Sequence, residues 1–202
     1  MVTIVDYGMG NLRSVAKAFE RLGVKARVTQ KPEEVTSAEK LVLPGVGAFE
    51  DAVRNLKELR LTESLLAFLD EGRPFLGICL GLQLLFAESE EGGLHKGFGR
   101  FPGRVKRFPE DSLKVPHIGW NRVNRTGRAE CPLLKGVPDG SYFYFVHSYY
   151  AEPADQTVTA AKTDYGIPFT SVLWRENVYA TQFHPEKSQA LGLKVLENFA
   201  RV

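Results

Sequence analysis

A cysteine between two glycines is the residue of this sequence most suited to nucleophilic chemistry. Cys79 is the centre of Gly77-Ile78-Cys79-Leu80-Gly81, which lies between an uncharged apolar run and a helical pattern. Glycines at these positions allow a tight turn that side chains would otherwise crowd. The helix beyond would favour a thiolate through its dipole, and the backbone N–H of Leu80 could stabilise an oxyanion. Because free cysteine is usually a small buried hydrophobic residue, this segment alone leaves catalysis and core packing equally open.

A histidine and a glutamate close to the C-terminus could supply the base that such a thiol needs. His184, Pro185 and Glu186 follow the predicted strand 178–183, so they would lie at a strand end, where open α/β sheets hold their sites. His184 could accept the thiol proton, and Glu186 could orient the imidazole and support its cation. Alone, this triplet is better explained as an exposed turn. Combined with Cys79 it predicts a Cys–His–Glu catalytic unit.

Two further segments could complete a substrate site. Val46 and Gly47 follow another predicted strand, in the sequence Pro-Gly-Val-Gly, and could bring a second backbone N–H to the oxyanion. An ordinary strand-to-helix turn explains the same segment. Gln83 lies one helical turn after Cys79 on the same face, so its amide could bind a polar substrate. The alternative for Gln83 is simply a polar residue on a helix.

Composition and spacing exclude several other classes of function. Lys and Arg number 26 and Asp and Glu 24, so no strong field predicts a nucleic-acid or membrane partner. Two cysteines form neither a disulfide framework nor a closed zinc site, and His95, His117 and His147 lack metal-ligand spacing. Arg13 breaks the dinucleotide fingerprint. We therefore expect no metal and no cofactor. Cys131, in a turn-rich stretch, is interpreted as a bystander.

The elements expected around these residues form a single α/β domain over residues 1–202. Its start has no basic region before an apolar run, which favours a cytoplasmic protein. In the first half, strands are predicted at 3–5, 24–29, 41–43 and 74–78. They alternate with a helix capped by Asn11, a helical region broken near Arg60 with Thr62 as a second cap, and a helix at 80–88. This alternation predicts a parallel sheet wrapped by helices. In the second half, a final helix follows strands at 97–108, 118–124, 142–146, 157–163, 169–174 and 178–183.

With these segments in hand, the chain resembles the class I, triad-type glutamine amidotransferases over nearly its full length. More narrowly, it is similar to the glutaminase subunits of imidazole glycerol phosphate synthases. Asn11 and the Gly-Trp-Asn and Pro-Glu-Lys-Ser sequences favour these subunits over other members. Six segments in order carry the resemblance: residues 6–12 (DYGMGNL), 44–47 (PGVG), 77–83 (GICLGLQ), 116–121 (PHIGWN), 147–150 (HSYY) and 183–188 (FHPEKS).

The resemblance implies a flavodoxin-like doubly wound sheet with additional antiparallel strands from the second half. It implies that Cys79 attacks the side-chain amide of glutamine, that His184 relays the proton to the leaving ammonia, and that Glu186 holds His184. Water would then cleave the thioester to release glutamate. The remaining implied roles are an oxyanion hole from Leu80 with Val46 or Gly47, and glutamine binding by Gly47, Gln83, Ser148 and Tyr149.

The resemblance also implies a separate cyclase subunit with a (β/α)8-barrel fold, which forms a heterodimer with the chain and takes the ammonia. That subunit would make imidazole glycerol phosphate and an aminoimidazole carboxamide ribotide in histidine biosynthesis. Asn11, Trp120, Tyr144 and Lys187 match positions facing the partner. Many amidotransferases have a second glycine where this chain has Val46. Because a β-branched residue resists unusual backbone states, an oxyanion N–H from Val46 is expected to depend on outside help.

Three other interpretations stay open at this point. The chain could be the glutaminase subunit of another amidotransferase. It could be a different cysteine hydrolase, such as a peptidase, in which case a peptide would be its substrate. It could also be a non-catalytic scaffold that keeps the fold, although the intact Cys79, His184 and Glu186 argue against that.

Overall fold

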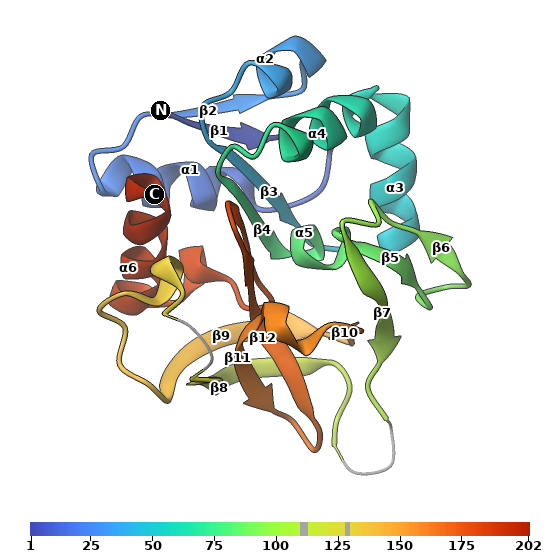
Figure 1. Ribbon diagram of the computed structural model, residues 1–202, viewed down its shortest axis with the longest axis vertical. Helices are drawn as coiled ribbons and strands as arrows, with labels where there is room; N and C mark the ends of the chain where they lie inside the picture. The colour runs from blue at the N-terminus through green and yellow to red at the C-terminus, as the bar shows by residue number, and fades with distance from the viewer. Residues whose placement is uncertain (110–112, 128–129) are drawn as a thin grey trace.

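The computed structural model describes residues 1–109, 113–127 and 130–202, and within them the chain is built around two β-sheets (Figure 1). In spatial order, the nine-stranded sheet consists of β2 (Ala26–Thr29), β1 (Val2–Val5), β3 (Leu41–Gly45), β4 (Phe75–Cys79), β13 (Val178–Thr181), β12 (Pro168–Arg175), β11 (Thr159–Asp164), β8 (His117–Arg125) and β9 (Ser141–His147). The four-stranded sheet consists of β10 (Tyr149–Pro153), β7 (Phe101–Arg107), β5 (Phe86–Ser89) and β6 (His95–Lys96).

The first part of the large sheet is parallel and has the strand order of a flavodoxin-like fold. Strands β2, β1, β3, β4 and β13 are neighbours in that order, and each neighbouring pair runs parallel. All residues of β1, β3, β4 and β13 are buried, as expected for parallel strands covered on both faces. The predicted doubly wound α/β fold is therefore confirmed, and its carboxyl ends form the edge where such folds bind ligands.

Helices cover both faces of this parallel region. On one face, α1 (Leu12–Arg21) and α6 (Gln189–Arg201) bury Phe19 and Phe199 against Ile4 and Ile78. On the other face lie α2 (Pro32–Thr36), α3 (Phe49–Glu58) and α4 (Leu61–Asp70). A short helix, α5 (Leu80–Gln83), and 3-10 turns at Pro132–Leu134, Gln156–Val158 and Pro185–Lys187 complete the elements.

The second half adds the expected antiparallel strands. Chain reversal at 175–177 makes β12 and β13 a hairpin, in which Arg175 faces Val178. Strands β11, β8 and β9 continue the sheet by antiparallel pairing, and β8 faces β9 in the register His117 with His147 and Trp120 with Tyr144. Figure 1 shows these strands below the parallel region. The hairpin turn predicted from the sequence is confirmed.

Several local predictions were wrong. The helix expected at 80–88 ends at Gln83, and β5 follows, because Phe86 pairs with and packs against Phe101 of β7, with ring centroids 6.1 Å apart. Strand β3 does not stop at Leu43 but continues to Gly45. It can contain Pro44, which has no N–H to donate, because β1 pairs with it only as far as Val42.

The third wrong prediction concerns the start of α4, whose cap is Arg60 in a left-handed conformation with φ of 56° rather than Thr62. The first helix begins as predicted, because the Asn11 side chain accepts a hydrogen bond from the Ser14 N–H at 3.3 Å. Strand β10, which starts at Tyr149, was not predicted at all, and the strand expected at 97–108 is limited to Phe101–Arg107.

Candidate active site

The backbone at Cys79 is a sharp, strained turn from a strand into a helix. Cys79 ends β4 with φ of 54° and ψ of −105°, a region that residues with a side chain rarely adopt. A Cβ at Gly81 would lie 1.9 Å from the Leu43 carbonyl oxygen of β3, and one at Gly77 would lie 2.6 Å from the Gly81 oxygen. The predicted role of the two glycines is confirmed, since any side chain there would collide with the neighbouring strand or helix.

The helix after Cys79 is much shorter than the sequence suggested. Helix α5 has only 4 residues, Leu80–Gln83, so its dipole is far weaker than that of a helix reaching residue 88. What α5 does provide is a backbone N–H at Leu80 directly after the nucleophile. The local electrostatics at the sulfur therefore depend more on side chains from other strands.

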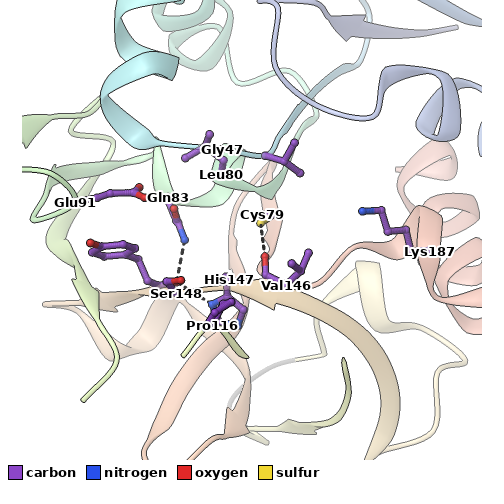
Figure 2. A pocket seen from close by; sticks show the side chains of 12 residues that line it. Gly47, Cys79, Leu80, Gln83, Glu91, Pro116, Val146, His147, Ser148 and Lys187 are labelled. Carbon is purple, nitrogen blue, oxygen red and sulfur yellow. Dashed lines mark hydrogen bonds between the residues drawn. The ribbon is translucent and has the colours of Figure 1, made fainter. Parts of the chain in front are cut away.

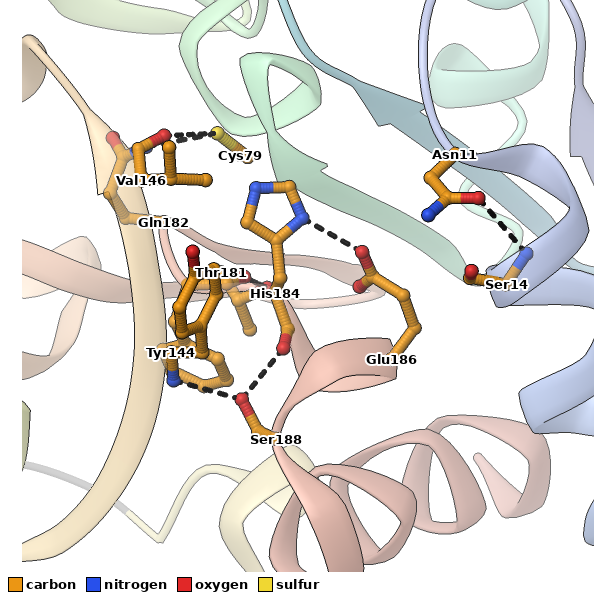
Figure 3. Close-up of polar contacts among 11 residues, drawn as sticks. Asn11, Ser14, Cys79, Tyr144, Val146, Thr181, Gln182, His184, Glu186 and Ser188 are labelled. Atoms are coloured by element: carbon orange, nitrogen blue, oxygen red, sulfur yellow. Dashed lines mark hydrogen bonds and ion pairs between the residues drawn. The ribbon is translucent and has the colours of Figure 1, made fainter. Parts of the chain in front are cut away.

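His184 and Glu186 form a buried pair, as predicted from their spacing. The His184 Nδ1 lies 2.8 Å from the Glu186 Oε1, and both side chains are 2% exposed (Figure 3). Burial by itself lowers the pKa of His184, but the neighbouring Cys79 sulfur and the Glu186 carboxylate outweigh burial and raise the pKa above its ordinary value. Among the described residues, no hydrogen-bond partner reaches the His184 Nε2, which leaves this nitrogen available to exchange a proton with the site.

Backbone hydrogen bonds fix His184 from both sides. Its N–H donates to the Tyr144 carbonyl of β9 at 2.9 Å, and its own carbonyl accepts from the Ser188 hydroxyl at 2.6 Å. The same hydroxyl accepts from the Tyr144 N–H at 3.0 Å. Strand β9 therefore holds the proposed base in place through Tyr144, which lies 40 residues before His184 along the chain.

A residue that the sequence analysis missed contacts the sulfur directly. Gln182 is fully buried, and its Nε2 donates to the Cys79 Sγ at 3.6 Å, while the Val146 carbonyl lies 4.0 Å from the same sulfur. The available signal was a polar residue inside the apolar predicted strand 178–183, two positions before His184. A polar side chain in such a place must find a buried partner.

The cysteine opens into a pocket of about 470 Å³ (Figure 2). Every residue predicted for the oxyanion hole or for glutamine binding lines this pocket: Val46, Gly47, Leu80, Gln83, Ser148 and Tyr149. They come from three segments, which are the loop after β3, helix α5, and the junction of β9 with β10. The carboxyl edge of the parallel region brings these segments together, as the fold requires.

Gln83 has less freedom to bind a ligand than its sequence position suggested. Its Nε2 donates to the Tyr149 carbonyl at 3.0 Å and to the Gln182 Oε1 at 3.2 Å, which uses both amide hydrogens. Its remaining polar atom for a ligand is the side-chain oxygen.

Another pocket residue, Glu91, was not predicted. Its carboxylate accepts from the Phe49 N–H at 2.9 Å, and burial raises its pKa.

The oxyanion segment puts its unusual backbone on glycine. Gly47 has φ of 103°, whereas Val46 is absent from the positive-φ residues of the described chain. A Cβ at Gly47 would lie 2.6 Å from the Met9 Cε, so the loop before α1 packs directly on this segment. The positive φ of this segment therefore lies on Gly47 and not on the β-branched Val46.

Three of the four predicted interface residues form one cluster. Trp120 and Tyr144 face each other on β8 and β9, with ring centroids 6.2 Å apart, and the Lys187 Nζ lies 5.8 Å from the Tyr144 ring centroid. Lys187 also lines the pocket. Ile118, Trp120 and Tyr142, on the same side of the two strands, are 58%, 46% and 48% exposed. Asn11 is exposed at the start of α1.

The second cysteine is in a different environment. Cys131 is 5% exposed, and burial raises the pKa of its thiol to about 11, which disfavours the thiolate. Over residues 1–109, 113–127 and 130–202, no group of three or more His, Cys, Asp or Glu side chains is arranged to hold a metal ion. No helix in the described part of the chain is long and apolar enough to cross a membrane.

Comparison with known proteins gives one consistent family. The family described as "Glutamine amidotransferase class-I" matches residues 3–202. The protein "Imidazole glycerol phosphate synthase subunit HisH" from Syntrophotalea carbinolica is 56% identical over 205 residues, covering 98% of each chain. The same subunit from Geobacter metallireducens is 53% identical, covering 98% of this chain and 97% of its own. The chain belongs to the HisH subunits of the class-I glutamine amidotransferase family.

Family membership confirms the resemblance found from the six sequence segments. A solved structure, "Structure of PurLQS from Thermotoga maritima", matches 99% of this chain and 97% of its own with a TM-score of 0.77 and 16% identity. At 16% identity this match shows the fold alone, and that fold agrees with the flavodoxin-like arrangement described above. The members of this family are glutamine amidotransferase enzymes.

Proposed function

We propose that the chain hydrolyses L-glutamine to L-glutamate and ammonia at Cys79, as the glutaminase subunit of an imidazole glycerol phosphate synthase. The observation that carries the proposal is a positive-φ cysteine that lines the pocket and interacts with the imidazole of a buried His184–Glu186 pair. The relatives named above match this chain over nearly their full length, and their names as HisH subunits support the choice of reaction. Residues 1–202 would act as one domain, in the cytoplasm.

The proposed chemistry has two stages. His184 takes the thiol proton of Cys79, and the resulting thiolate attacks the side-chain amide carbon of glutamine. His184 then gives this proton to the amide nitrogen, the carbon–nitrogen bond breaks, and ammonia leaves behind a thioester. Water attacks the thioester, His184 takes a proton from the water and returns it to the sulfur, and glutamate is released. Glu186 keeps the Nδ1–H of His184 in place and stabilises its cation.

Two backbone donors would stabilise the oxyanion of each stage. The Leu80 N–H follows the nucleophile directly, and Val46 and Gly47, which line the same pocket, would supply the second N–H. Such donors act at the charge that develops in the transition state. Gln182, which donates to the sulfur at 3.6 Å, would steady a negative charge on Cys79 before attack.

The rest of the pocket matches the charges of free glutamine. Glu91 offers a carboxylate on the pocket wall, suited to the α-ammonium group of an amino acid. The Gln83 side-chain oxygen, Ser148 and Tyr149 line the remaining wall and would hold the polar parts of the substrate. Glu91 is partly buried with a raised pKa, so a bound ammonium would also relieve the cost of its burial.

The ammonia would pass to a cyclase subunit with a (β/α)8-barrel fold. The subunit names of the relatives support a partner in a complex. We propose that the partner covers the exposed apolar side of β8 and β9, which carries Trp120, together with Tyr144, Lys187 and Asn11. Lys187 touches both this cluster and the pocket, so it would lie at the boundary between the two subunits.

The test is a measurement of glutamate release by the purified chain with a range of substrates. We expect glutamate from L-glutamine, with turnover raised by a cyclase subunit and its nucleotide substrate, and no cleavage of peptides. Cleavage of a peptide without glutamine hydrolysis would favour another cysteine hydrolase. Glutamine hydrolysis that does not respond to the cyclase but responds to another synthase subunit would assign the chain to a different amidotransferase.

A further inference from the structure

Two histidines that the proposed chemistry does not use form a buried pair beside the pocket. His117 of β8 and His147 of β9 face each other in the strand register, and the His117 Nδ1 lies 2.9 Å from the His147 Nε2. They are 3% and 6% exposed. Because β8 and β9 alternate their side chains, this inner pair lies on the opposite face from Trp120 and Tyr144.

Aromatic rings surround the pair and keep it uncharged. The His117 ring stacks between Phe145 and Tyr165, with centroids at 5.0 and 4.0 Å, and the His147 ring lies 5.1 Å from that of Phe169. Burial lowers the pKa of His117 to about 4 and that of His147 to about 3. The charged forms of His117 and His184 lower the pKa of His147 further. Both rings are therefore neutral at pH 7.

The groups at the two ends of the pair determine where each neutral ring carries its hydrogen. The His147 Nδ1 lies 2.8 Å from the Tyr149 carbonyl, which only accepts, so this nitrogen donates and the His147 Nε2 must accept. The His117 Nδ1 then donates to it. At the other end, the Asn121 Nδ2 lies 3.2 Å from the His117 Nε2 and donates its other hydrogen to the Asp164 carbonyl at 2.9 Å. The three hydrogen bonds therefore all donate in the same direction, from Asn121 to His117, from His117 to His147, and from His147 to the Tyr149 carbonyl.

The chain of hydrogen bonds ends at the pocket wall. The Tyr149 carbonyl that accepts from His147 also accepts from the Gln83 Nε2 at 3.0 Å. Gln83 in turn donates to Gln182, which donates to the Cys79 sulfur. His147, Ser148 and Tyr149 all line the pocket. The orientation of this wall therefore depends on a carbonyl whose two donors are a glutamine of the pocket and the histidine pair.

We propose that His117 and His147 are positioning residues for glutamine binding, each neutral and carrying its hydrogen on Nδ1. His117 acts through His147, and His147 fixes the Tyr149 carbonyl and with it Gln83 and the 147–149 wall. This role rests on the proposed glutaminase function. A neutral pair also avoids placing a second cation next to His184, whose own positive charge the proton relay requires.

The first test is independent of activity. Long-range ¹H–¹⁵N NMR of the histidine rings distinguishes an Nδ1–H from an Nε2–H ring and from a cation. We expect Nδ1–H forms for both His117 and His147 from pH 7 down to pH 5. An Nε2–H form at either ring, or protonation of either above pH 6, would overturn the proposal.

The second test compares two substitutions of His117. His117→Asn keeps a donor near the Nδ1 position, whereas His117→Phe fills the aromatic site and leaves the His147 Nε2 without a donor. We expect His117→Phe to raise the KM for glutamine by about tenfold or more with a smaller change in kcat, and His117→Asn to recover most of that loss. His117→Phe should also change the NMR signature of His147, and far-UV circular dichroism checks that each variant is folded.

The outcomes separate this proposal from the proposed function. If the unmodified chain, with its cyclase, releases no glutamate, the proposed glutaminase function is wrong. The NMR measurement still tests the protonation states of His117 and His147, because it does not depend on activity. If the unmodified chain hydrolyses glutamine and folded His117→Phe has an unchanged KM, the positioning role is wrong. Equal defects in kcat and KM for His117→Phe and His117→Asn would indicate loss of packing and would also reject it.

Discussion

At the scale of single residues, the reactivity of Cys79 rests on a backbone conformation that its own side chain disfavours. A non-glycine residue at φ of 54° costs roughly 1–2 kcal/mol, and such strain persists only where the surrounding structure imposes it. Here the strand register of β3 with β4 and the close approach of Gly81 to Leu43 impose it. The sulfur is consequently held at the pocket edge, where Gln182 and the Val146 carbonyl reach it.

Substitution of the nucleophile should separate glutamine use from ammonia use. We expect Cys79→Ala to abolish glutamate release, because no other described thiol reaches the pocket, while the complex with the cyclase still makes product from ammonium salts. Glutamate release and product formation are measured with each nitrogen source. Cys131→Ala is the matched control and should keep full glutaminase activity, since that thiol is buried in the core. A trapped thioester at Cys131 would contradict the assignment.

His184 and Glu186 should behave as one unit with Cys79. Groups that act together lose activity non-additively, so His184→Ala added to Cys79→Ala should cost little more than either change alone. Glu186→Gln should keep more activity than His184→Ala, because the amide retains an acceptor near Nδ1 but loses the charge. Steady-state kcat/KM values for the single and double variants provide the measurement. A silent Glu186→Gln would show that this carboxylate has no part in catalysis.

At the scale of the elements, the turn between β4 and α5 depends on the missing side chain of Gly81. We expect Gly81→Ala to destabilise the fold by about 3 kcal/mol or more, because its Cβ would meet the Leu43 carbonyl at 1.9 Å and backbone must move. Gly23→Ala is the control. It has a positive φ of 72° but no atom within 4 Å, so it should cost only about 1 kcal/mol. Urea unfolding measures both, and equal losses would reject the steric explanation.

The pairing of β8 with β9 should weaken as the pH falls. The pKa values of about 4 and about 3 for His117 and His147 lie below the unfolded value of about 6.5, so from pH 6.5 down to about 4 the unfolded chain binds more protons. Stability therefore falls with pH in that window, by up to about 1.4 kcal/mol per pH unit for each histidine. The raised pKa of His184 opposes this slope near pH 6.5, where the unfolded ring is only partly protonated, and contributes none below about pH 5.5, where the ring is protonated in both states.

Urea unfolding between pH 7 and pH 4 measures this slope. The matched variant carries both His117→Asn and His147→Asn, which removes the two titrations and leaves the surface carboxylates common to both proteins. We expect its free energy of unfolding to change less steeply with pH than that of the unmodified chain. Parallel curves for the two proteins would show that the histidine pair does not titrate as described.

At the scale of the whole molecule, one residue, Tyr144, contacts both the candidate site and the exposed apolar side of β8 and β9. The Tyr144 carbonyl holds the His184 N–H at 2.9 Å, and the ring of the same residue contacts Trp120 and Lys187. A subunit bound at this surface would therefore touch Tyr144, which positions His184, the proposed base.

We expect hydrolysis by the isolated chain to be slow and to rise by roughly 10²–10³ with the cyclase and its nucleotide, the scale of one oxyanion donor. The partner can do this only by binding the competent state of the 44–47 segment more tightly. Glutamate production is measured for the chain alone, with cyclase, and with cyclase plus nucleotide. Equal turnover in all three would contradict partner activation. A full rise in Trp120→Ala and Lys187→Ala would leave activation intact but exclude these residues as its route.

The sequence by itself determined the class of fold and predicted the residues of the candidate site. Cys79 between glycines, His184 two positions before Glu186, and the strand–helix alternation of the first half depend on spacing within short segments. Local spacing is what a sequence displays directly. The same is true of Asn11 as a helix cap and of the hairpin at 175–177, both of which use contacts a few residues apart.

Only the tertiary structure decided the features that rest on distant pairing. Strand β5 replaced the second half of a predicted helix because Phe86 meets a strand that comes later in the chain. Gln182 reaches Cys79 across 103 positions, and His117 reaches His147 across 30. Nothing in the residues next to these side chains specifies such partners, because burial of whole sheet faces fixes them. The register of β8 with β9 buries one face of that pair, and the pairing of β4 with β13 buries both faces.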